Sequence, residues 1–221
     1  MKQMELWVVN TRALGLSPHL NELLGLLPDD DRSKALRYRL PADRLRCAVG
    51  RVLIRSLAAE TVGNYKAPLC FTEYGKPYFS DRSAPRFSLS HSGELVVLAV
   101  SDGPVGVDVE EIRPIDLGDF DTVLTDAEKS AVRASGNALT EFYRIWTARE
   151  AYSKLDGRGV GLFEGCFQWE RSKRGCDFRT FESDAHVLTL CADHIPPELV
   201  PDVFSQSKWK TVLAKLEEHV I

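Results

Sequence analysis

The spacing of apolar residues changes several times along this 221-residue chain, and each change marks a switch between helix and strand. Helical spacing runs from Pro41 to about Ala59, with Val49 and Leu53 on one side of the helix. From residue 69 the spacing becomes that of strands, and helical spacing returns between residues 125 and 155 before strands follow again. This order predicts a mixed α+β fold.

The same order predicts two similar α+β halves that pack together. The change from one half to the other falls near Ser101–Pro104, so we expect an N-terminal half of residues 1–103 and a C-terminal half of residues 104–221. Three strands around this point are expected to form an antiparallel meander joined at residues 91–94 and 101–104. They are Arg86–Ser90, Leu95–Val100 and Val105–Glu110.

Composition places the protein among ordinary soluble globular chains. Apolar residues make up 44% and charged residues 27% of the sequence. Apolar runs such as Leu95–Val100 are far shorter than the roughly 20 residues that a membrane span needs, and Leu6–Val9 is too short for the core of a signal peptide. We therefore expect a cytoplasmic protein that does not enter a membrane. Five scattered cysteines without a close pair favour reduced thiols over disulfides.

Charge is distributed unevenly along the sequence. The net charge of −4 argues against a general nucleic-acid binder. Eight basic residues and one acid lie between Arg32 and Arg55, whereas acids dominate between Asp108 and Glu128. A basic segment that faces an acidic one suits a phosphorylated small ligand held with a metal ion. Two solvated helix faces are the simpler explanation of the same pattern.

The strand Val105–Glu110 places two carboxylates on one face. Side chains alternate along a strand, so the valines face one way and Asp108 and Glu110 the other, with Cα atoms roughly 6.5–7 Å apart. Gly106 lies on the acidic face and leaves room beside them. Oxygen ligands at this spacing suit Mg²⁺, which commonly shares its coordination with phosphates. An amphipathic strand with a wet polar face is the alternative.

An acid and a base extend the apolar stripe of the predicted helix 138–155. The stripe includes Phe142 and Trp146, and the same step leads next to Glu150 and Lys154. Burying either charge without a partner would cost several kcal/mol. We therefore expect the stripe to leave the core at this point and enter a polar cleft. An exposed ion pair between positions four residues apart is the alternative.

Two turns carry groups that suit phosphate. Ser90, His91 and Ser92 lie where a strand runs into a turn, and their side chains and backbone N–H groups are candidates to receive phosphate oxygens. Lys76 lies in the turn Gly75-Lys76-Pro77. The adjacent serine and histidine also raise the possibility of a nucleophilic triad, but the sequence contains no G-x-S-x-G elbow.

Together these segments match a known family in order and spacing. The segments are Gly75-Lys76-Pro77, Ser88-Leu89-Ser90-His91-Ser92, Gly106-Val107-Asp108-Val109-Glu110 and Trp146-Thr147-Ala148-Arg149-Glu150-Ala151-Tyr152-Ser153-Lys154. Over about residues 28–165 the chain resembles the surfactin-type 4'-phosphopantetheinyl transferases. Two positions depart from that pattern, because Ser88 replaces the usual asparagine and Arg149 replaces the usual lysine.

The resemblance implies a pseudo-twofold fold of two halves with the active site in the cleft between them. It implies an enzyme that transfers 4'-phosphopantetheine from coenzyme A to a serine of an acyl or peptidyl carrier protein and releases 3',5'-ADP. Mg²⁺ would be held by Asp108, Glu110 and Glu150. Glu150 would also act as the base, directly or through a metal-bound water, and Lys154 would meet a phosphate oxygen. The groups expected to contact coenzyme A are Lys76, Ser90, His91, Lys34 and Arg46. Two fused halves make a monomer sufficient.

Two other classes of function fit parts of the sequence. A Mg²⁺-dependent phosphoesterase or nuclease also uses two acids on a strand and one on a helix. A non-catalytic nucleic-acid-binding module would use the basic segment Arg32–Arg55, although the acidic total and the Glu150–Lys154 pair argue against it.

Overall fold

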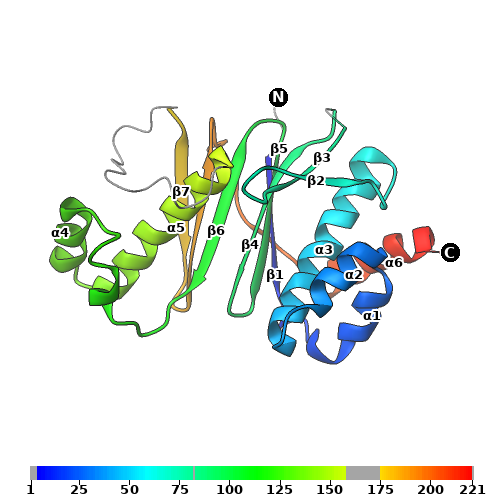
Figure 1. Ribbon diagram of the computed structural model, residues 1–221, viewed down its shortest axis with the longest axis horizontal. Helices are drawn as coiled ribbons and strands as arrows, with labels where there is room; N and C mark the ends of the chain where they lie inside the picture. The colour runs from blue at the N-terminus through cyan, green and yellow to red at the C-terminus, as the bar shows by residue number, and fades with distance from the viewer. Residues whose placement is uncertain (1–3, 82, 158–174, 221) are drawn as a thin grey trace.

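Two sheets face each other across the middle of the molecule, and a long helix covers the outer face of each (Figure 1). The computed structural model describes residues 4–81, 83–157 and 175–220. The elements are β1 (Met4–Asn10), a 3₁₀ helix (Ser17–His19), α1 (Leu20–Gly25), α2 (Asp29–Leu36), α3 (Pro41–Val62), β2 (Leu69–Phe71), β3 (Pro77–Phe79), β4 (Arg86–Ser92), β5 (Leu95–Ser101), β6 (Val105–Glu111), a second 3₁₀ helix (Leu117–Phe120), α4 (Asp126–Ala134), α5 (Ala138–Asp156), β7 (Asp177–Glu182), β8 (His186–Ala192), β9 (Asp202–Val203) and α6 (Gln206–Val220). The sequence also predicts a strand at Phe163–Trp169, and these residues lie outside the described part of the chain.

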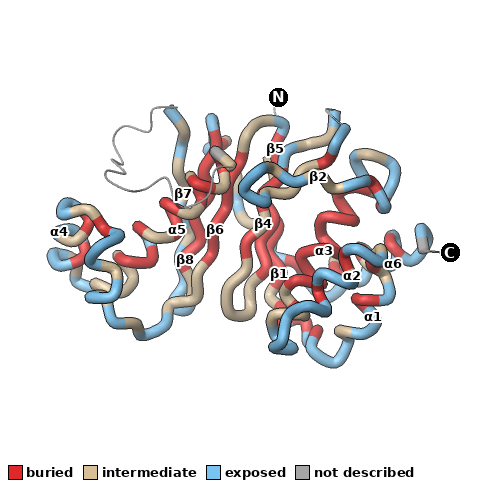
Figure 2. The backbone as a smooth tube through the Cα atoms, viewed as in Figure 1, coloured by how far each residue is buried: buried red, intermediate tan, exposed pale blue. Residues whose placement is uncertain are grey.

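The first sheet has the strand order β4-β5-β1-β9 and packs its outer face on α3. Alternation along β5 explains how it contributes to two cores. Val96 and Leu98 belong to the core under α3, whereas Val97 and Ala99 face the second sheet. α3 begins with Pro41 and ends at Gly63 in the left-handed conformation, so both ends carry residues suited to helix termini. Buried stretches follow α3 and the central strands in Figure 2.

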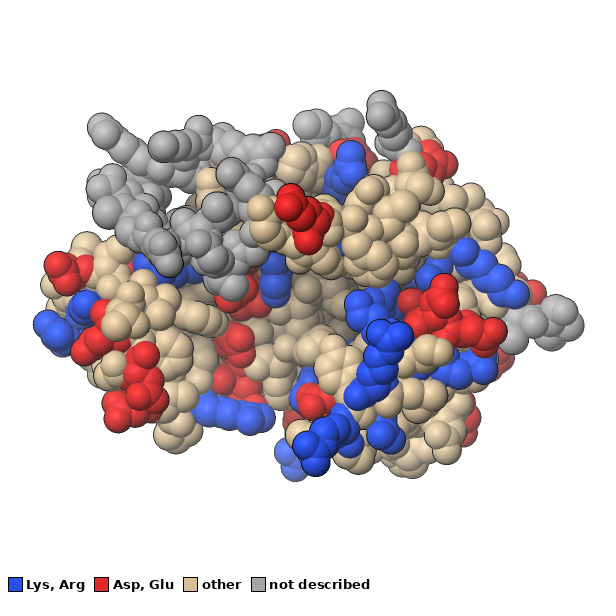
Figure 3. Space-filling view, viewed as in Figure 1, with Lys and Arg blue, Asp and Glu red and all other residues tan. Residues whose placement is uncertain are grey.

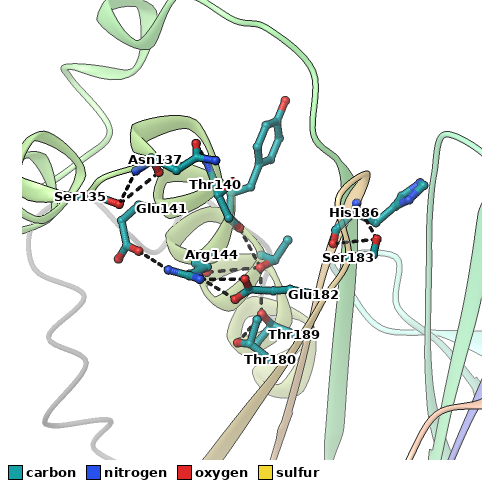
Figure 4. Close-up of polar contacts among 12 residues, drawn as sticks. Ser135, Asn137, Thr140, Glu141, Arg144, Thr180, Glu182, Ser183, His186 and Thr189 are labelled. Atoms are coloured by element: carbon teal, nitrogen blue, oxygen red, sulfur yellow. Dashed lines mark hydrogen bonds and ion pairs between the residues drawn. The ribbon is translucent and has the colours of Figure 1, made fainter.

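The second sheet has the order β6-β8-β7 and packs its outer face on α5. Threonine hydroxyls fix the register of α5 on this sheet. The buried hydroxyl of Thr147 lies 2.8 Å from that of Thr189 on β8. The hydroxyl of Thr189 also lies 3.1 Å from that of Thr180 on the exposed face of β7 (Figure 4). At the surface, Arg144 on α5 forms two hydrogen bonds with Glu182 on β7. α5 is therefore held on the sheet at a defined position.

Gly106 allows α5 to approach β6 closely. A Cβ atom at this position would lie only 1.9 Å from the carbonyl oxygen of Ala151 and 2.5 Å from the backbone nitrogen of Leu155. The space beside the acidic face of β6, which we expected to be open, is therefore filled by the backbone of α5. The close approach brings the last two turns of α5, which carry Glu150 and Lys154, beside β6.

The expected three-stranded meander is wrong in its third strand. β4 and β5 pair as expected, but β6 pairs with β8 and starts the second sheet. The alternation of residues 105–110 specifies which side chains share a face of the strand. It does not specify which strand pairs with residues 105–110, because the same alternation fits any neighbour. β4 also continues to Ser92, so the turn into β5 is confined to Gly93 and Glu94, with φ of +55° at Gly93.

The two sheets meet where β4 lies alongside β6, and serine hydroxyls replace the usual backbone ladder. Three serines on one face of β4 each accept a hydrogen bond from a backbone N–H of β6. The pairs are Val107 N to Ser88 Oγ (3.1 Å), Val109 N to Ser90 Oγ (3.3 Å) and Glu111 N to Ser92 Oγ (3.1 Å). We call this set of contacts the serine seam. It joins the halves through side chains.

The C-terminal segment returns to the first half. β9 pairs with β1, and α6 packs on α3, with Trp209 and Leu216 in the core under that helix. The predicted boundary at residues 103 and 104 falls in the turn between β5 and β6. The expected extent of the second half to residue 221 does not follow this packing, because β9 completes the first sheet and α6 its helical layer. No helix in the described ranges is long and apolar enough to cross a membrane.

We predict that Gly106→Ala lowers the free energy of unfolding by about 3 kcal/mol or more, because helix backbone occupies the place of the new methyl group. Gly136→Ala is the matched control, since a Cβ there would meet no atom within 4 Å. Urea denaturation of both variants measures the difference. Equal stabilities would show that α5 does not press against β6 as described.

Candidate active site

A cleft of about 290 Å³ opens where the two halves meet. Its walls come from the β2–β3 turn, from β4 and from the C-terminal part of α5. The lining includes Tyr74, Lys76, Leu89, Glu150, Ser153 and Lys154. Figure 3 shows acidic side chains along one side of the central hollow, toward β6 and α5, and basic side chains on the opposite side, toward α2 and α3. The sequence predicted such opposed charges.

The apolar stripe of α5 leaves the core where expected. Phe142 is 1% exposed and packs under α4, Trp146 is half-buried, and Glu150 and Lys154 line the cleft. The charged pair thus continues a buried stripe without being buried in the core. The structure confirms that the stripe enters a cleft, although apolar atoms make up most of the cleft's lining.

Asp108 lies beneath this cleft, only 3% exposed. Its Oδ1 accepts hydrogen bonds from Lys154 Nζ at 2.6 Å and from Ser90 Oγ at 2.7 Å. Its Oδ2 is buried and has no hydrogen-bond partner. A buried carboxylate oxygen without a donor costs free energy, and a cation is a suitable partner for it.

Glu110 and Glu150 share the electrostatic environment of Asp108. Burial raises the pKa of Glu150, and the carboxylates of Asp108 and Glu110 raise it further, while Lys154 opposes the rise. Burial likewise raises the pKa of Glu110, although a hydrogen bond from Ser92 lowers it and Asp108 adds to the rise. The three acids therefore lie near enough to repel one another.

The donor set suits a hard divalent cation. Three carboxylates, one with an unpartnered buried oxygen, are the ligands that Mg²⁺ prefers, and a cation would relieve the repulsion that raises the two pKa values. The side chains do not yet form a coordination sphere. In the part of the chain that the structure describes, no three acidic, histidine or cysteine side chains are grouped closely enough to hold an ion.

Lys76 holds the β2–β3 turn against the second half. Its ammonium donates to the carbonyl oxygen of Val105 at 2.9 Å and to that of Lys154 at 2.6 Å. The residue lines the cleft as predicted. Its hydrogen bonds to the two backbone carbonyl oxygens leave only part of its hydrogen-bonding capacity for a ligand.

Three residues of the basic side that were predicted to bind the ligand do not line the 290 Å³ cleft: His91, Arg46 and Lys34. His91 faces α3, where burial and the nearby Arg46 lower its pKa. Arg46 donates to the carbonyl oxygen of Gly93 at 2.8 Å and pairs with Asp43. Lys34 lies over the ring of Phe71 at 5.1 Å.

Two details limit where a ligand can bind on the basic side. The room that Gly50 leaves on α3 is filled by Leu89, so no ligand can approach there without moving that side chain. Arg51 and Arg55 are buried and pair with Asp31 of α2, at 3.2 Å and 2.5 Å, so they join two helices and do not face a ligand.

Arg149 is a structural residue. It is 1% exposed, forms two hydrogen bonds with Glu128 at 2.9 Å and 2.6 Å, and donates to the carbonyl oxygen of Val123. Glu128 also completes the capping box with Thr125 that starts α4. The planar fork of arginine suits this paired contact, which anchors α4 to α5.

The sequence placed Ser90 and Ser92 in a phosphate-binding turn, but the structure places both in a strand. The hydroxyl of Ser90 is bound to Asp108, Lys154 and the N–H of Val109, and that of Ser92 to Glu110 and the N–H of Glu111. The signal was present in the alternation, since Ser88, Ser90 and Ser92 share one face of any strand that includes them. The sequence could not say which strand that face would meet.

Comparison with known proteins gives one family for both halves. The sequence model described as the 4'-phosphopantetheinyl transferase superfamily matches residues 104–194, and the one described as 4'-phosphopantetheinyl transferase, N-terminal, matches residues 16–103. The 4'-phosphopantetheinyl transferase psf-1 of Bacillus pumilus is 34% identical over 189 residues, which cover 78% of this chain and 81% of that protein. The 4'-phosphopantetheinyl transferase Sfp of Bacillus subtilis strain 168 is 28% identical over 206 residues, covering 85% and 91%.

We predict that Arg149→Ala lowers the free energy of unfolding by about 3–5 kcal/mol, because it leaves the buried carboxylate of Glu128 without its cation. Arg144→Ala, on the same helix with a side chain 44% exposed, is the control and should cost less than about 1 kcal/mol. Chemical denaturation measures both. A small effect at Arg149 would argue against its anchoring role.

Proposed function

Because this chain belongs to the 4'-phosphopantetheinyl transferase superfamily and is of the surfactin type, we propose that it transfers 4'-phosphopantetheine from coenzyme A to a serine of an acyl or peptidyl carrier protein. The reaction releases 3',5'-ADP. The observation that carries the proposal is that Glu150 and Lys154 line the same cleft, while Lys154 also bonds the buried Asp108 at 2.6 Å. This arrangement supplies a base, a cation and an acidic floor at one place.

Asp108, Glu110 and Glu150 are the residues proposed to hold Mg²⁺. The bound ion would neutralise charge on the diphosphate under attack and on the leaving group. The unpartnered Oδ2 of Asp108 and the raised pKa values of Glu110 and Glu150 support this assignment.

Glu150 is proposed to take the proton from the hydroxyl of the carrier serine. A general base must have a carboxylate within reach of the nucleophile, and Glu150 lines the cleft on α5.

Lys154 is proposed to meet a phosphate oxygen of coenzyme A. Its ammonium lies 2.6 Å from Asp108 Oδ1 and its side chain is 30% exposed to the cleft, so it can offset negative charge on either side. Contact with Asp108 and exposure to the cleft suit a residue whose positive charge offsets the acids in the free enzyme and the phosphates in the complex.

The basic side of the hollow is proposed to receive the rest of the coenzyme. Lys76 at the cleft and His91, Lys34 and Arg46 around α3 are the proposed contacts to its phosphates and nucleotide. Such contacts would orient the coenzyme so that its diphosphate lies over the acids.

The direct test is the intact mass of purified apo carrier proteins after incubation with the enzyme, coenzyme A and Mg²⁺. The proposal expects one added phosphopantetheine on at least one carrier and an equal amount of 3',5'-ADP. Released free phosphate or cut nucleic acid, with no gain of mass on any carrier, would instead indicate a phosphoesterase or nuclease.

We predict that Asp108→Asn and Glu150→Gln each lower the transfer rate by about 10²–10⁴-fold, since each removes a charge proposed to act on the reacting groups. Both changes nearly preserve side-chain shape, so the circular dichroism spectrum should match that of the wild type. Mass spectrometry of the carrier follows the reaction. Normal modification by either variant refutes the assignment of that residue.

We also predict that Lys154→Ala lowers turnover by about a hundredfold, as expected for the loss of a charge that stabilises a phosphoryl transition state. Arg12→Ala is the control, because Arg12 forms an ion pair with Glu94 but its side chain is 82% exposed. Its turnover should stay within about twofold of wild type. Equal losses in the two variants would mean that Lys154 acts only as a general surface charge.

A further inference from the structure

Two serines of the first half hold two acids of the second half through the serine seam. Ser90 Oγ donates to Asp108 Oδ1 and Ser92 Oγ donates to Glu110 Oε2, both at 2.7 Å. We propose that Ser90 and Ser92 are positioning residues that set the orientation of these carboxylates for the metal ion. This inference rests on the proposed function, because it assigns a role toward the ion that the acids are proposed to hold.

The direction of each hydrogen bond follows from what the hydroxyls already accept. A serine hydroxyl has one proton to donate and two lone pairs that accept. Ser90 Oγ accepts from Val109 N at 3.3 Å and from Lys154 Nζ at 3.0 Å, so its proton is left for Asp108. Ser92 Oγ accepts from Glu111 N at 3.1 Å, and its proton goes to Glu110. Each carboxylate is therefore held by a donor that β6 itself orients.

Burial makes the contact at Ser90 specific. Ser90 is 7% exposed and Asp108 3%, so water cannot replace the hydroxyl without opening the seam. With Oδ1 engaged by Ser90 and Lys154, Oδ2 is the oxygen of Asp108 that remains for a cation. Ser92 and Glu110 are only half-buried, which makes Ser92 the easier residue to change without unfolding the protein.

Ser88 provides a control within the same seam. It accepts from Val107 N at 3.1 Å, as the other two serines accept from their own N–H groups. The residue of β6 in register to receive its proton is Gly106, which has no side chain. Ser88 therefore shares the structural role of the seam and lacks the contact to an acid.

Partners that orient metal-binding side chains commonly change metal affinity by about 10–100-fold when they are removed. We therefore expect Ser92→Ala and Ser90→Ala to weaken Mn²⁺ binding at least tenfold in the presence of excess coenzyme A. Ser88→Ala should weaken it less than about threefold, although it loses the same type of backbone contact. Ser92→Thr keeps the hydroxyl and should restore affinity to within about threefold of wild type.

The experiment titrates Mn²⁺ into wild type and each variant and measures free ion by electron paramagnetic resonance, with circular dichroism as the check of folding. Mn²⁺ binding by Ser92→Ala and Ser90→Ala equal to that of Ser88→Ala, in a wild type that binds Mn²⁺ and modifies a carrier, overturns this inference alone. A wild type that neither binds Mn²⁺ nor modifies a carrier overturns the proposed function and this inference with it. Failure of Ser92→Thr to bind better than Ser92→Ala also contradicts the assignment.

Discussion

The edge of β6 that faces β4 determines how the two halves join and where the candidate site lies. One edge of this strand pairs with β8, and the N–H groups of its other edge need acceptors where the two halves meet. The hydroxyls of Ser88, Ser90 and Ser92 supply them. Because side chains alternate, the same register turns the acidic face of β6 toward α5, and the close approach at Gly106 brings that helix beside the acids. The join between the halves and the candidate site are thus one set of contacts.

Placing acids at this join carries an electrostatic cost, which other contacts offset. Burial and mutual repulsion raise the pKa values of Glu110 and Glu150, and the ammonium of Lys154 partly compensates from the same helix. Away from the site, buried carboxylates are paired directly with arginine side chains. Arg149 anchors α4 to α5 through Glu128, and Asp31 joins α2 to α3 through Arg55. The one buried carboxylate oxygen without a partner among the described residues is Asp108 Oδ2, at the site itself.

Much of this arrangement could be predicted from the sequence, because local patterns determine faces and ends. The capping box at Thr125, the apolar stripe leading to Glu150 and the alternation around Asp108 each describe residues close together in the chain, and each is found in the structure. Partners distant in sequence could not be predicted in this way. Alternation did not reveal that β6 pairs with β8, that the space beside Gly106 receives helix backbone, or that Arg149 would be buried against Glu128. Those facts depend on how elements pack together.

We propose that the acids of β6 and α5, aligned by the contacts between the halves, act together on one ion and one diphosphate. A crystal structure of the protein with coenzyme A and Mg²⁺ tests it most directly. We expect one ion bound to the carboxylates of Asp108, Glu110 and Glu150 and to the diphosphate, with the serine seam intact. An ion held elsewhere, or a diphosphate bound away from these three side chains, would contradict it.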